Sequence, residues 1–318
     1  MSQQIPSVSI GIPIHNGAHY LSQALNSILA QTFEDFEVVI SDNASTDATQ
    51  EICEQYAAKD SRIRYIRQKT NRGGAWNFNE VVRMARGKYF KWAAHDDWLA
   101  PTYLEKAVAE LEASDSTVLV YPRTILVCED PAEREFYGGH YVYYEDQMDI
   151  RHPDPFHRMS HVAKHLGLCN SVMGLFRRDT LVKTGMIRPF SGSDVVLLSE
   201  TSLHGEIHEL PEYLFYRRRH PGTSRLANTT REAVARWFST DPDRPRPKLA
   251  PGWNLLWEQI KVIWKSSLPA FQRVHGILRF LATRAVRWTR TRLGRYKRRA
   301  LGQDLAVRSQ PVEIERHV

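Results

Sequence analysis

The chain has 318 residues, of which 42% are hydrophobic and 25% are charged, and this composition excludes a disordered protein. No apolar run approaches the roughly 18 residues that cross a bilayer, and the polar start at 1–7 lacks a signal-peptide pattern. Three cysteines without C-x-x-C spacing argue against a disulfide framework or a zinc knuckle. We therefore expect a protein of the cytoplasm.

Basic residues gather toward the C-terminal end of the sequence. Between Gln259 and Gln303 there are twelve Lys or Arg and no acid. Subtracting these twelve from the formal net charge of +7 leaves about −5 for the rest of the chain. We expect a mildly acidic body and a basic tail that offers a surface to a partner.

The first hundred residues alternate β-rich runs with helical patterns, which indicates βαβ units and a mainly parallel sheet flanked by helices. The expected strands cover 8–14, 37–41, 63–67 and 89–93. Apolar residues at helical spacing predict helices around 21–29, 52–57 and 75–84, and another that starts near Pro101. The fold class is therefore α/β of a Rossmann-like type.

The later part of the sequence is less regular. It predicts strands at 118–127 and 171–176, helices at 178–183 and 194–203, and a mobile loop or hairpin at 129–155. Prolines mark 240–252 as a linker between a main domain, 1–239, and a helical tail, 253–318. In the tail one apolar stripe is edged by arginines; it comprises Leu268, Phe271, Val274, Leu278, Leu281, Ala285 and Trp288.

Polar side chains follow three of the expected strands. In an α/β sheet, ligands bind beyond the carboxyl ends of the strands, so these side chains are candidate binding groups. The sequence has no G-x-G-x-x-G after the first strand and no G-x-x-x-x-G-K-[ST], so a dehydrogenase or P-loop protein would lack its phosphate cradle. The candidates are Pro13, His15 and Asn16, then Asp42, Asn43, Ser45 and Asp47, then His95, Asp96 and Asp97.

Asp96 and Asp97 carry the strongest chemical signal. Two adjacent carboxylates at a strand end repel each other unless a cation or a set of donors offsets them. Hard oxygen ligands suit Mg²⁺ or Mn²⁺, which proteins hold with one or two carboxylates plus substrate phosphates. A plainer interpretation stays open, in which the acids only favour the start of the helix near Pro101. Similarly, the segment 41–47 could be a simple strand-to-helix turn with a capping hydroxyl.

Four segments stand in a fixed order along the chain: V-S-I-G-I-P-I-H-N, V-V-I-S-D-N-A-S-T-D, N-R-G-G-A-W-N-F-N and A-H-D-D-W-L-A-P. In this order and spacing they resemble glycosyltransferase family 2, over about residues 7–225. The resemblance implies a GT-A fold, with a nucleotide-sugar half at about 1–120 and an acceptor half at about 121–239. It implies an inverting transferase that depends on Mg²⁺ or Mn²⁺ and uses a nucleotide diphosphate sugar, most simply a UDP-sugar.

The resemblance also implies a role for each matching position. Asp97 corresponds to a metal ligand and Asp96 to a ribose or sugar contact, but Ala94 stands where many relatives carry a first acid. That departure leaves the division of roles between Asp96 and Asp97 open. The positions that match the nucleotide-sugar site are Pro13, His15, Asn16, Asp42, Asn43, Arg72 and Asn79.

Two later segments complete the expected site. Asp194 resembles an acid that opens a helix under the acceptor, and it is our candidate for the general base, although an Asp is also simply favourable at a helix start. The run Y-R-R-R-H-P-G-T-S resembles a basic loop over the diphosphate, with Arg219 as a phosphate contact and His220 as a metal or phosphate ligand. A solvated basic turn is the alternative for any single residue of this loop.

The expected function is transfer of a sugar to a hydroxyl of a glycan or a lipid-linked acceptor, in polysaccharide or cell-envelope synthesis. A non-catalytic sugar-nucleotide or glycan-binding module of the same fold is the alternative. The basic tail fits an amphipathic helix on the inner face of an anionic membrane; packing against the main domain or a second subunit also remains open. No nucleic-acid reading motif is present, so we expect no nucleic-acid partner.

Overall fold

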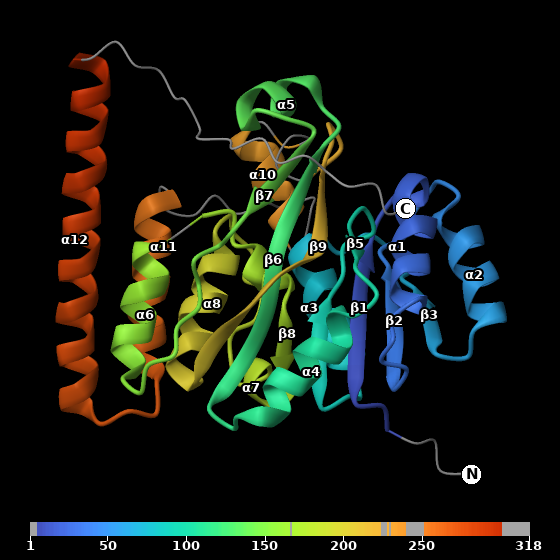
Figure 1. The fold of residues 1–318 in the computed structure, drawn as a ribbon, viewed down its shortest axis with the longest axis horizontal. Coiled ribbons are helices and arrows are strands. Elements are labelled where there is room, and N and C mark those ends of the chain that lie inside the picture. The colour runs from blue at the N-terminus through green and yellow to red at the C-terminus, as the bar shows by residue number, and fades with distance from the viewer. Residues whose placement is uncertain (1–4, 166, 224–227, 229, 240–250, 301–318) are drawn as a thin grey trace.

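The computed structural model describes residues 5–165, 167–223, 228, 230–239 and 251–300 (Figure 1). One sheet runs through the molecule in the order β3-β2-β1-β4-β8-β6-β9-β5, and β7 pairs with β6 beside this path. The strands are β1 (Val8–Ile14), β2 (Phe36–Asp42), β3 (Ile63–Arg67), β4 (Tyr89–Trp92), β5 (Trp98–Leu99), β6 (Thr117–Cys128), β7 (Tyr141–Tyr144), β8 (Leu175–Arg177) and β9 (Glu206–Arg219).

Helices flank the sheet on both faces, and two more extend the chain at its C-terminal end. The early helices are α1 (Ala18–Leu29), α2 (Thr49–Lys59), α3 (Gly74–Met84) and α4 (Tyr103–Ala113). The middle ones are α5 (Pro131–Tyr137), α6 (Pro155–Lys164), the 3-10 helix η1 (Asn170–Met173), α7 (Arg178–Leu181) and α8 (Ser193–His204). The last are α10 (Arg231–Phe238), α11 (Pro251–Lys265) and α12 (Ala270–Ala300). No helix within the described ranges is both long enough and apolar enough to cross a bilayer.

The N-terminal half of the sheet is parallel. β1 pairs in parallel with β2 and β4, and β2 pairs in parallel with β3. The four strands and four helices predicted for this half are all present, with bounds that differ from the prediction by at most a few residues at each end. Continuous burial along β1 and β2 agrees with strands covered on both faces, which is why they appear in the sequence as unbroken apolar runs.

Two apolar clusters fill the two faces of the sheet. On one face Leu21 and Leu25 of α1 and Leu104 of α4 are fully buried against the strands. On the other face Val81 and Val82 of α3 pack with the middle of α8. Neighbouring residues of β4 alternate between the clusters, because successive side chains of a strand point to opposite faces.

The second half of the sheet is mixed, and here three expectations need correction or completion. β8 is antiparallel to β4 and to β6, whereas β9 is parallel to β6. The strand predicted at 171–176 is wrong over its first part, because η1 occupies Asn170–Met173 and the strand begins only at Leu175. The segment 129–155, predicted as a loop or hairpin, contains α5 and the strand β7 that pairs with β6.

The C-terminal helices lie at the opposite edge of the molecule from β3 and α2 (Figure 1). α11 packs on α8, and α12 packs on α6. Of the predicted linker 240–252, residues 240–250 lie outside the described residues, and α11 already begins at Pro251. The predicted tail is therefore helical as far as Ala300, the last residue that is described.

Candidate active site

A cavity of about 550 Å³ opens at the carboxyl ends of β1, β2 and β4. The register of the parallel strands sets Ile14 opposite Asp42, so the segments that follow β1 and β2 meet at one edge of the sheet. Seven of the candidate residues from the sequence line this cavity; they are Pro13, His15, Asn16, Asn43, His95, Asp96 and Asp97.

Tight turns hold the first part of the cavity wall. Asn16 and Ala44 adopt positive φ angles of 54° and 60°, a conformation that non-glycine residues seldom adopt. The Asn16 side-chain oxygen accepts a hydrogen bond from the Thr46 N–H, and the Asn16 backbone N–H donates to Ser45 Oγ. Gly17 lets the His95 ring come close, since a Cβ there would lie 2.5 Å from the ring. The turns after β1 and β2 therefore brace each other before any ligand arrives.

Asp42 lies behind this wall rather than in it. Its carboxylate is fully buried, accepting hydrogen bonds from Ser45 N at 2.8 Å and from the Tyr65 hydroxyl at 2.7 Å. Arg67 completes the set, with its Nε 3.5 Å from Asp42 Oδ2. These contacts give Asp42 a role in shaping the turn, and its predicted contact with a base stays a prediction.

Asn43 organises the loop between β3 and α3. Its side-chain amide donates to Asn71 Oδ1 at 2.8 Å, and its oxygen accepts from the Arg72 N–H at 2.9 Å. The Arg72 guanidinium lies over the Trp76 ring, 3.9 Å from the ring centre, and the residue is exposed. Arg72 is thus beside the cavity but not among its lining residues.

Asp96 and Asp97 follow β4, and the structure separates their partners. Asp96 Oδ2 lies 3.1 Å from His220 Nε2, and Asp97 Oδ1 accepts the Arg218 N–H at 2.8 Å. In the neutral ring, where His220 Nδ1 accepts from the Gly222 N–H, Nε2 carries the proton that is donated to Asp96. His220 is therefore engaged with Asp96, and it could bind a metal only after giving up this contact.

The charges of the two acids are balanced to different degrees. Burial would raise the pKa of Asp96, but the His220 hydrogen bond and the charges of His95 and His220 hold it below the ordinary value. Burial and the neighbouring charge of Asp96 raise the pKa of Asp97, against the opposing effects of Arg217, the Arg218 N–H and Lys91. The negative charge on Asp97 is thus only partly compensated by the protein.

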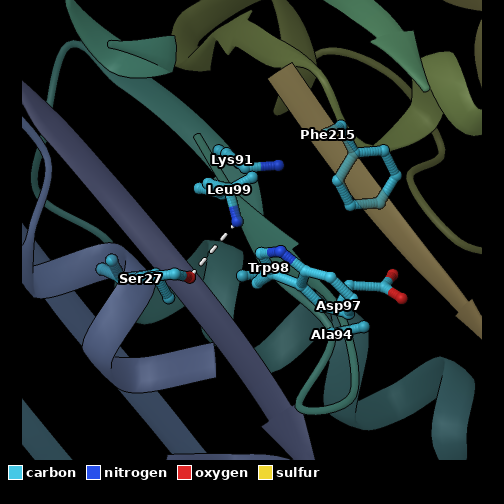
Figure 2. Close-up of a pocket in the computed structure, with 9 residues that line it drawn as sticks. Ser27, Lys91, Ala94, Asp97, Trp98, Leu99 and Phe215 are labelled. Atoms are coloured by element: carbon cyan, nitrogen blue, oxygen red, sulfur yellow. Dashed lines mark hydrogen bonds between the residues drawn. The ribbon is translucent and has the colours of Figure 1, made fainter. Parts of the chain in front are cut away.

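Lys91 lies close to Asp97 in a small pocket under the cavity (Figure 2). The side chain is fully buried, with its ammonium group bonded to the Met173 carbonyl and lying over the rings of Tyr103 and Phe215. Burial lowers the pKa of Lys91, while the charge of Asp97 opposes this change. The charges of Lys91 and Asp97 therefore interact, although the two side chains do not form a direct ion pair.

The acidic pair suits a divalent cation that is shared with substrate phosphates, rather than one held by protein side chains alone. No group of three or more His, Cys, Asp or Glu within the described ranges could hold a metal by itself. A buried carboxylate with an uncompensated charge at a cavity wall is the donor set that Mg²⁺ and Mn²⁺ share with substrate phosphates. Asp97, rather than Asp96, has this property.

Asp194 stands in the first turn of α8, after Gly192 at a φ of 89°. Its Oδ1 accepts the Val195 N–H at 2.9 Å. Burial raises the pKa of Asp194, and the guanidinium of Arg217 opposes this rise. Asp194 does not itself line the cavity, but Arg217 does, and Arg217 acts electrostatically on both Asp97 and Asp194.

Two predicted nucleotide-sugar residues lie away from the cavity. Asn79 uses its amide to bind the backbone of Ile187, donating to the carbonyl at 2.8 Å and accepting from the N–H at 3.0 Å. Arg219 is 1% exposed and donates from Nε to Glu133 on α5 at 2.8 Å. Both side chains hold distant segments together, and their predicted contacts with the nucleotide sugar stay predictions.

Several cavity residues were not predicted as site residues. Asn71, Asn77 and Phe78 come from the loop and helix after β3, where the resemblance marked the segment without singling them out. Arg236 and Trp237 come from α10, and Trp237 packs on Phe78 and over Gly74. The pattern after Thr230 is enough to suggest a short capped helix, but nothing local indicates that this helix closes the cavity.

Comparison with known proteins decides the family. The model of "Glycosyl transferase family 2" matches residues 9–181, which is more than half of the chain. The chain belongs to glycosyl transferase family 2. The match confirms the resemblance, and it spans the strands and loops that form the cavity as far as α7.

Curated relatives and solved structures agree with this family. An uncharacterized glycosyltransferase of Rickettsia typhi is 33% identical over 146 residues, covering 46% of this chain and 45% of the relative. Chondroitin synthase of Escherichia coli is 38% identical over 119 residues, covering 37% of this chain and 17% of the relative. The matched region thus spans less than half the length of these relatives.

The solved structures show the fold. TarS of S. aureus in complex with UDP-GlcNAc has a TM-score of 0.62 at 18% identity, covering 87% of this chain and 72% of that protein. The mannosyltransferase PcManGT of Pyrobaculum calidifontis, in complex with GDP-Man and Mn²⁺, has a TM-score of 0.51 at 18% identity, covering 94% and 81%. The predicted GT-A fold of family 2 is confirmed.

Proposed function

We propose that this protein is an inverting, metal-dependent transferase that moves a sugar from a nucleotide diphosphate sugar to a hydroxyl group. The observation that carries the proposal is the buried, undercompensated carboxylate of Asp97 at the wall of a cavity of about 550 Å³. Family membership supports transfer of a glycosyl group, and the acidic pair supports a cation.

We assign donor binding and stabilisation of the leaving group to different residues of the cavity wall. His15, Asn16 and Asn43 border the space that we assign to the nucleotide. Arg217 reaches the cavity with a charge that suits the departing diphosphate. A divalent cation held by Asp97 would supply stabilisation of the negative charge that develops on the leaving group. Arg218 fixes Asp97 from behind through its backbone N–H.

Asp194 is the proposed general base. Its carboxylate would take the proton of the acceptor hydroxyl as that oxygen bonds to the anomeric carbon and the bond to the diphosphate breaks. Attack from the face opposite the leaving group inverts the configuration at this carbon. A pKa above the ordinary Asp value, caused by burial, makes Asp194 a stronger base than an exposed carboxylate.

The donor and acceptor are proposed by similarity. A neighbouring structure holds UDP-GlcNAc and another holds GDP-Man with Mn²⁺, which supports a nucleotide-sugar donor, and we favour a UDP-sugar. The name of one relative, chondroitin synthase, supports a glycan acceptor. We propose a glycan or lipid-linked acceptor in polysaccharide or envelope synthesis, used in the cytoplasm at the inner face of the membrane.

A thermal-shift screen tests the proposal, because a ligand that binds only the folded protein raises its melting temperature. UDP-sugars and GDP-sugars are each added with Mn²⁺ or with a chelator, to the native protein and to Asp97→Asn. We expect a metal-dependent shift with one donor, lost in the variant, and slow release of the nucleotide diphosphate with that donor. Binding without any release, with or without acceptor glycans, would instead favour the non-catalytic module. Equal shifts in melting temperature with Mn²⁺ and with the chelator would contradict the role of Asp97.

A further inference from the structure

α12 has two apolar faces, and among the described residues one of them packs on the body while the other is exposed. On the inner face Phe280 is 1% exposed and packs with Phe156 and Met159 of α6. Gly276 lies so close to the Phe156 ring that a Cβ there would come within 2.0 Å of it. Arg279 pairs with Asp154 at the start of α6. These contacts fix how the helix is rotated on the body.

The fixed rotation turns most of the predicted apolar stripe outward. Phe271 is 73% exposed and Leu278 is 62% exposed. Residues near them in the sequence, such as Leu268 and Ile277, do pack against the body. α11 and α12 lie at the same edge of the molecule (Figure 1), and α11 also carries exposed tryptophan side chains. We name these exposed residues the outer face; they are Trp253, Trp257, Trp264, Phe271, Val274, Leu278 and Leu281.

The charge around the outer face limits what can cover it. The segment from Gln259 to Gln303 carries twelve Lys or Arg and no acid. Lys261 lies over the Trp257 ring, at 5.6 Å from the ring centre, and Arg273 lies over the Trp264 ring at 5.4 Å. A second copy of this chain that docked through the same face would bring segments of like charge together, which repels. An anionic surface offers the opposite charge.

We propose that the outer face of α11 and α12 binds the surface of an anionic lipid bilayer. Tryptophan rings favour the level of the lipid headgroups, and apolar side chains such as Phe271 and Leu278 reach the acyl boundary below them. Lysine and arginine side chains beside these rings then lie among the anionic headgroups. The proposal concerns a surface outside the cavity, so it does not depend on the proposed transfer reaction.

Flotation with vesicles tests this surface directly, using the full chain without any sugar nucleotide. The vesicles are phosphatidylcholine alone or phosphatidylcholine mixed with phosphatidylglycerol. Phe271→Ser combined with Leu278→Ser removes apolar contact without touching the inner face. Val182→Ser is the matched control, because Val182 is also an exposed apolar residue, 47% exposed, but lies after α7 and outside the tail.

We expect the native chain and Val182→Ser to float with the anionic vesicles and not with the neutral ones, with less binding at high salt. The double variant should lose roughly tenfold or more in partitioning, as expected when two large apolar side chains no longer enter the lipid. Its melting temperature should match that of the native chain, since neither side chain is buried. Tryptophan fluorescence should shift to the blue on binding, to a smaller extent in the double variant.

Three results would overturn the proposal. The first is no flotation of the native chain with anionic vesicles at low salt. The second is equal flotation of the double variant, which would leave the outer face without a role. The third is a different occupant of the same face: light scattering that finds a native dimer and a monomeric double variant, or a labelled single-stranded RNA whose binding that variant abolishes.

Discussion

The two halves of the sheet build their shares of the cavity in different ways. In the parallel half, the side chains after β1 and β2 are held by neighbours in the same or the adjacent turn, as Asn16 is held by Ser45 and Thr46. In the mixed half, the charged residues of β9 are held by partners far away in sequence, as Arg218 is held by Glu129 and Gln23. The first half is a locally determined binding surface, whereas the second depends on the assembled fold.

The Asp97→Asn variant tests the point where the two halves meet and should have the largest effect. The amide oxygen can still accept the Arg218 N–H, so the fold should persist while the charge is lost. We expect turnover to fall by at least about a thousandfold, as for loss of a main electrostatic group in an active site. Metal-dependent nucleotide binding, measured by calorimetry, should weaken in parallel.

Asp149→Asn is the control, since this exposed acid pairs with Arg151 at the surface. It should leave both measurements unchanged. Equal losses in Asp149→Asn and Asp97→Asn would mean that general charge, and not the site, is responsible.

The Asp194→Asn variant separates the base from the donor site. Loss of a general base costs about 10² to 10⁴ in rate, and Asp194 is not among the cavity residues that we assign to the nucleotide. We expect turnover to fall by that amount while the dissociation constant for the nucleotide stays within about twofold of the native value. Full activity in this variant would disprove the assignment of Asp194.

The Glu133→Gln variant tests the long-range support of β9. Arg219 is buried, and Glu133 neutralises it through an ion pair with a distance of 2.7 Å. Removing the acid leaves a buried charge without its partner, so the free energy of unfolding should fall by about 3 kcal/mol in urea titration. The matched change Arg219→Met removes the buried charge itself and should cost less. The reverse order would show that this pair does not stabilise β9.

The Arg217→Met variant should show its smallest effect in the position of the pH profile, apart from the lower rate that follows from the lost charge beside the diphosphate. Burial raises the pKa of Asp194, and the Arg217 charge opposes the rise, so removing that charge raises the pKa further. A base works only as the carboxylate, so activity is lost as the pH falls through this pKa. We expect the acid limb of kcat/KM to move to higher pH, so that the rate below it is lower than in the native protein. Arg217→Lys keeps the charge and should move the limb less; no difference from the native profile in either variant would exclude the coupling.

The sequence predicted the parallel half well, because buried parallel strands form continuous apolar runs and their ends carry the binding residues. This rule alone places Asp96 and Asp97 beyond the end of β4, and both residues do line the cavity there. The strand prediction failed at 171–176 for a physical reason: Asp146 accepts the Ser171 N–H, and Cys169 has a positive φ of 54°, so the chain turns before β8. Neither contact is visible in the local pattern.

Long-range partners set the other limits of prediction. The sequence does not show that Arg219 is paired with Glu133 of α5, nor that the Asn79 amide is bonded to the backbone of Ile187. Arg236 and Trp237 reach the cavity only because α10 folds back onto α3. For the tail, periodicity indicated one apolar stripe, whereas the structure uses Phe280 on a neighbouring face and leaves Phe271 exposed.

Arg218 joins segments that are far apart in the sequence: its guanidinium binds Gln23 of α1, the Asp96 carbonyl and Glu129 after β6, while its N–H binds Asp97. Spreading the two halves apart would break all of these bonds at once. These bonds hold the Arg218 side of the site in place, so we expect it to stay fixed when a donor binds. Adjustment to sugars of different size is then left to other parts of the cavity wall, such as Trp237, which packs on Phe78 and over Gly74.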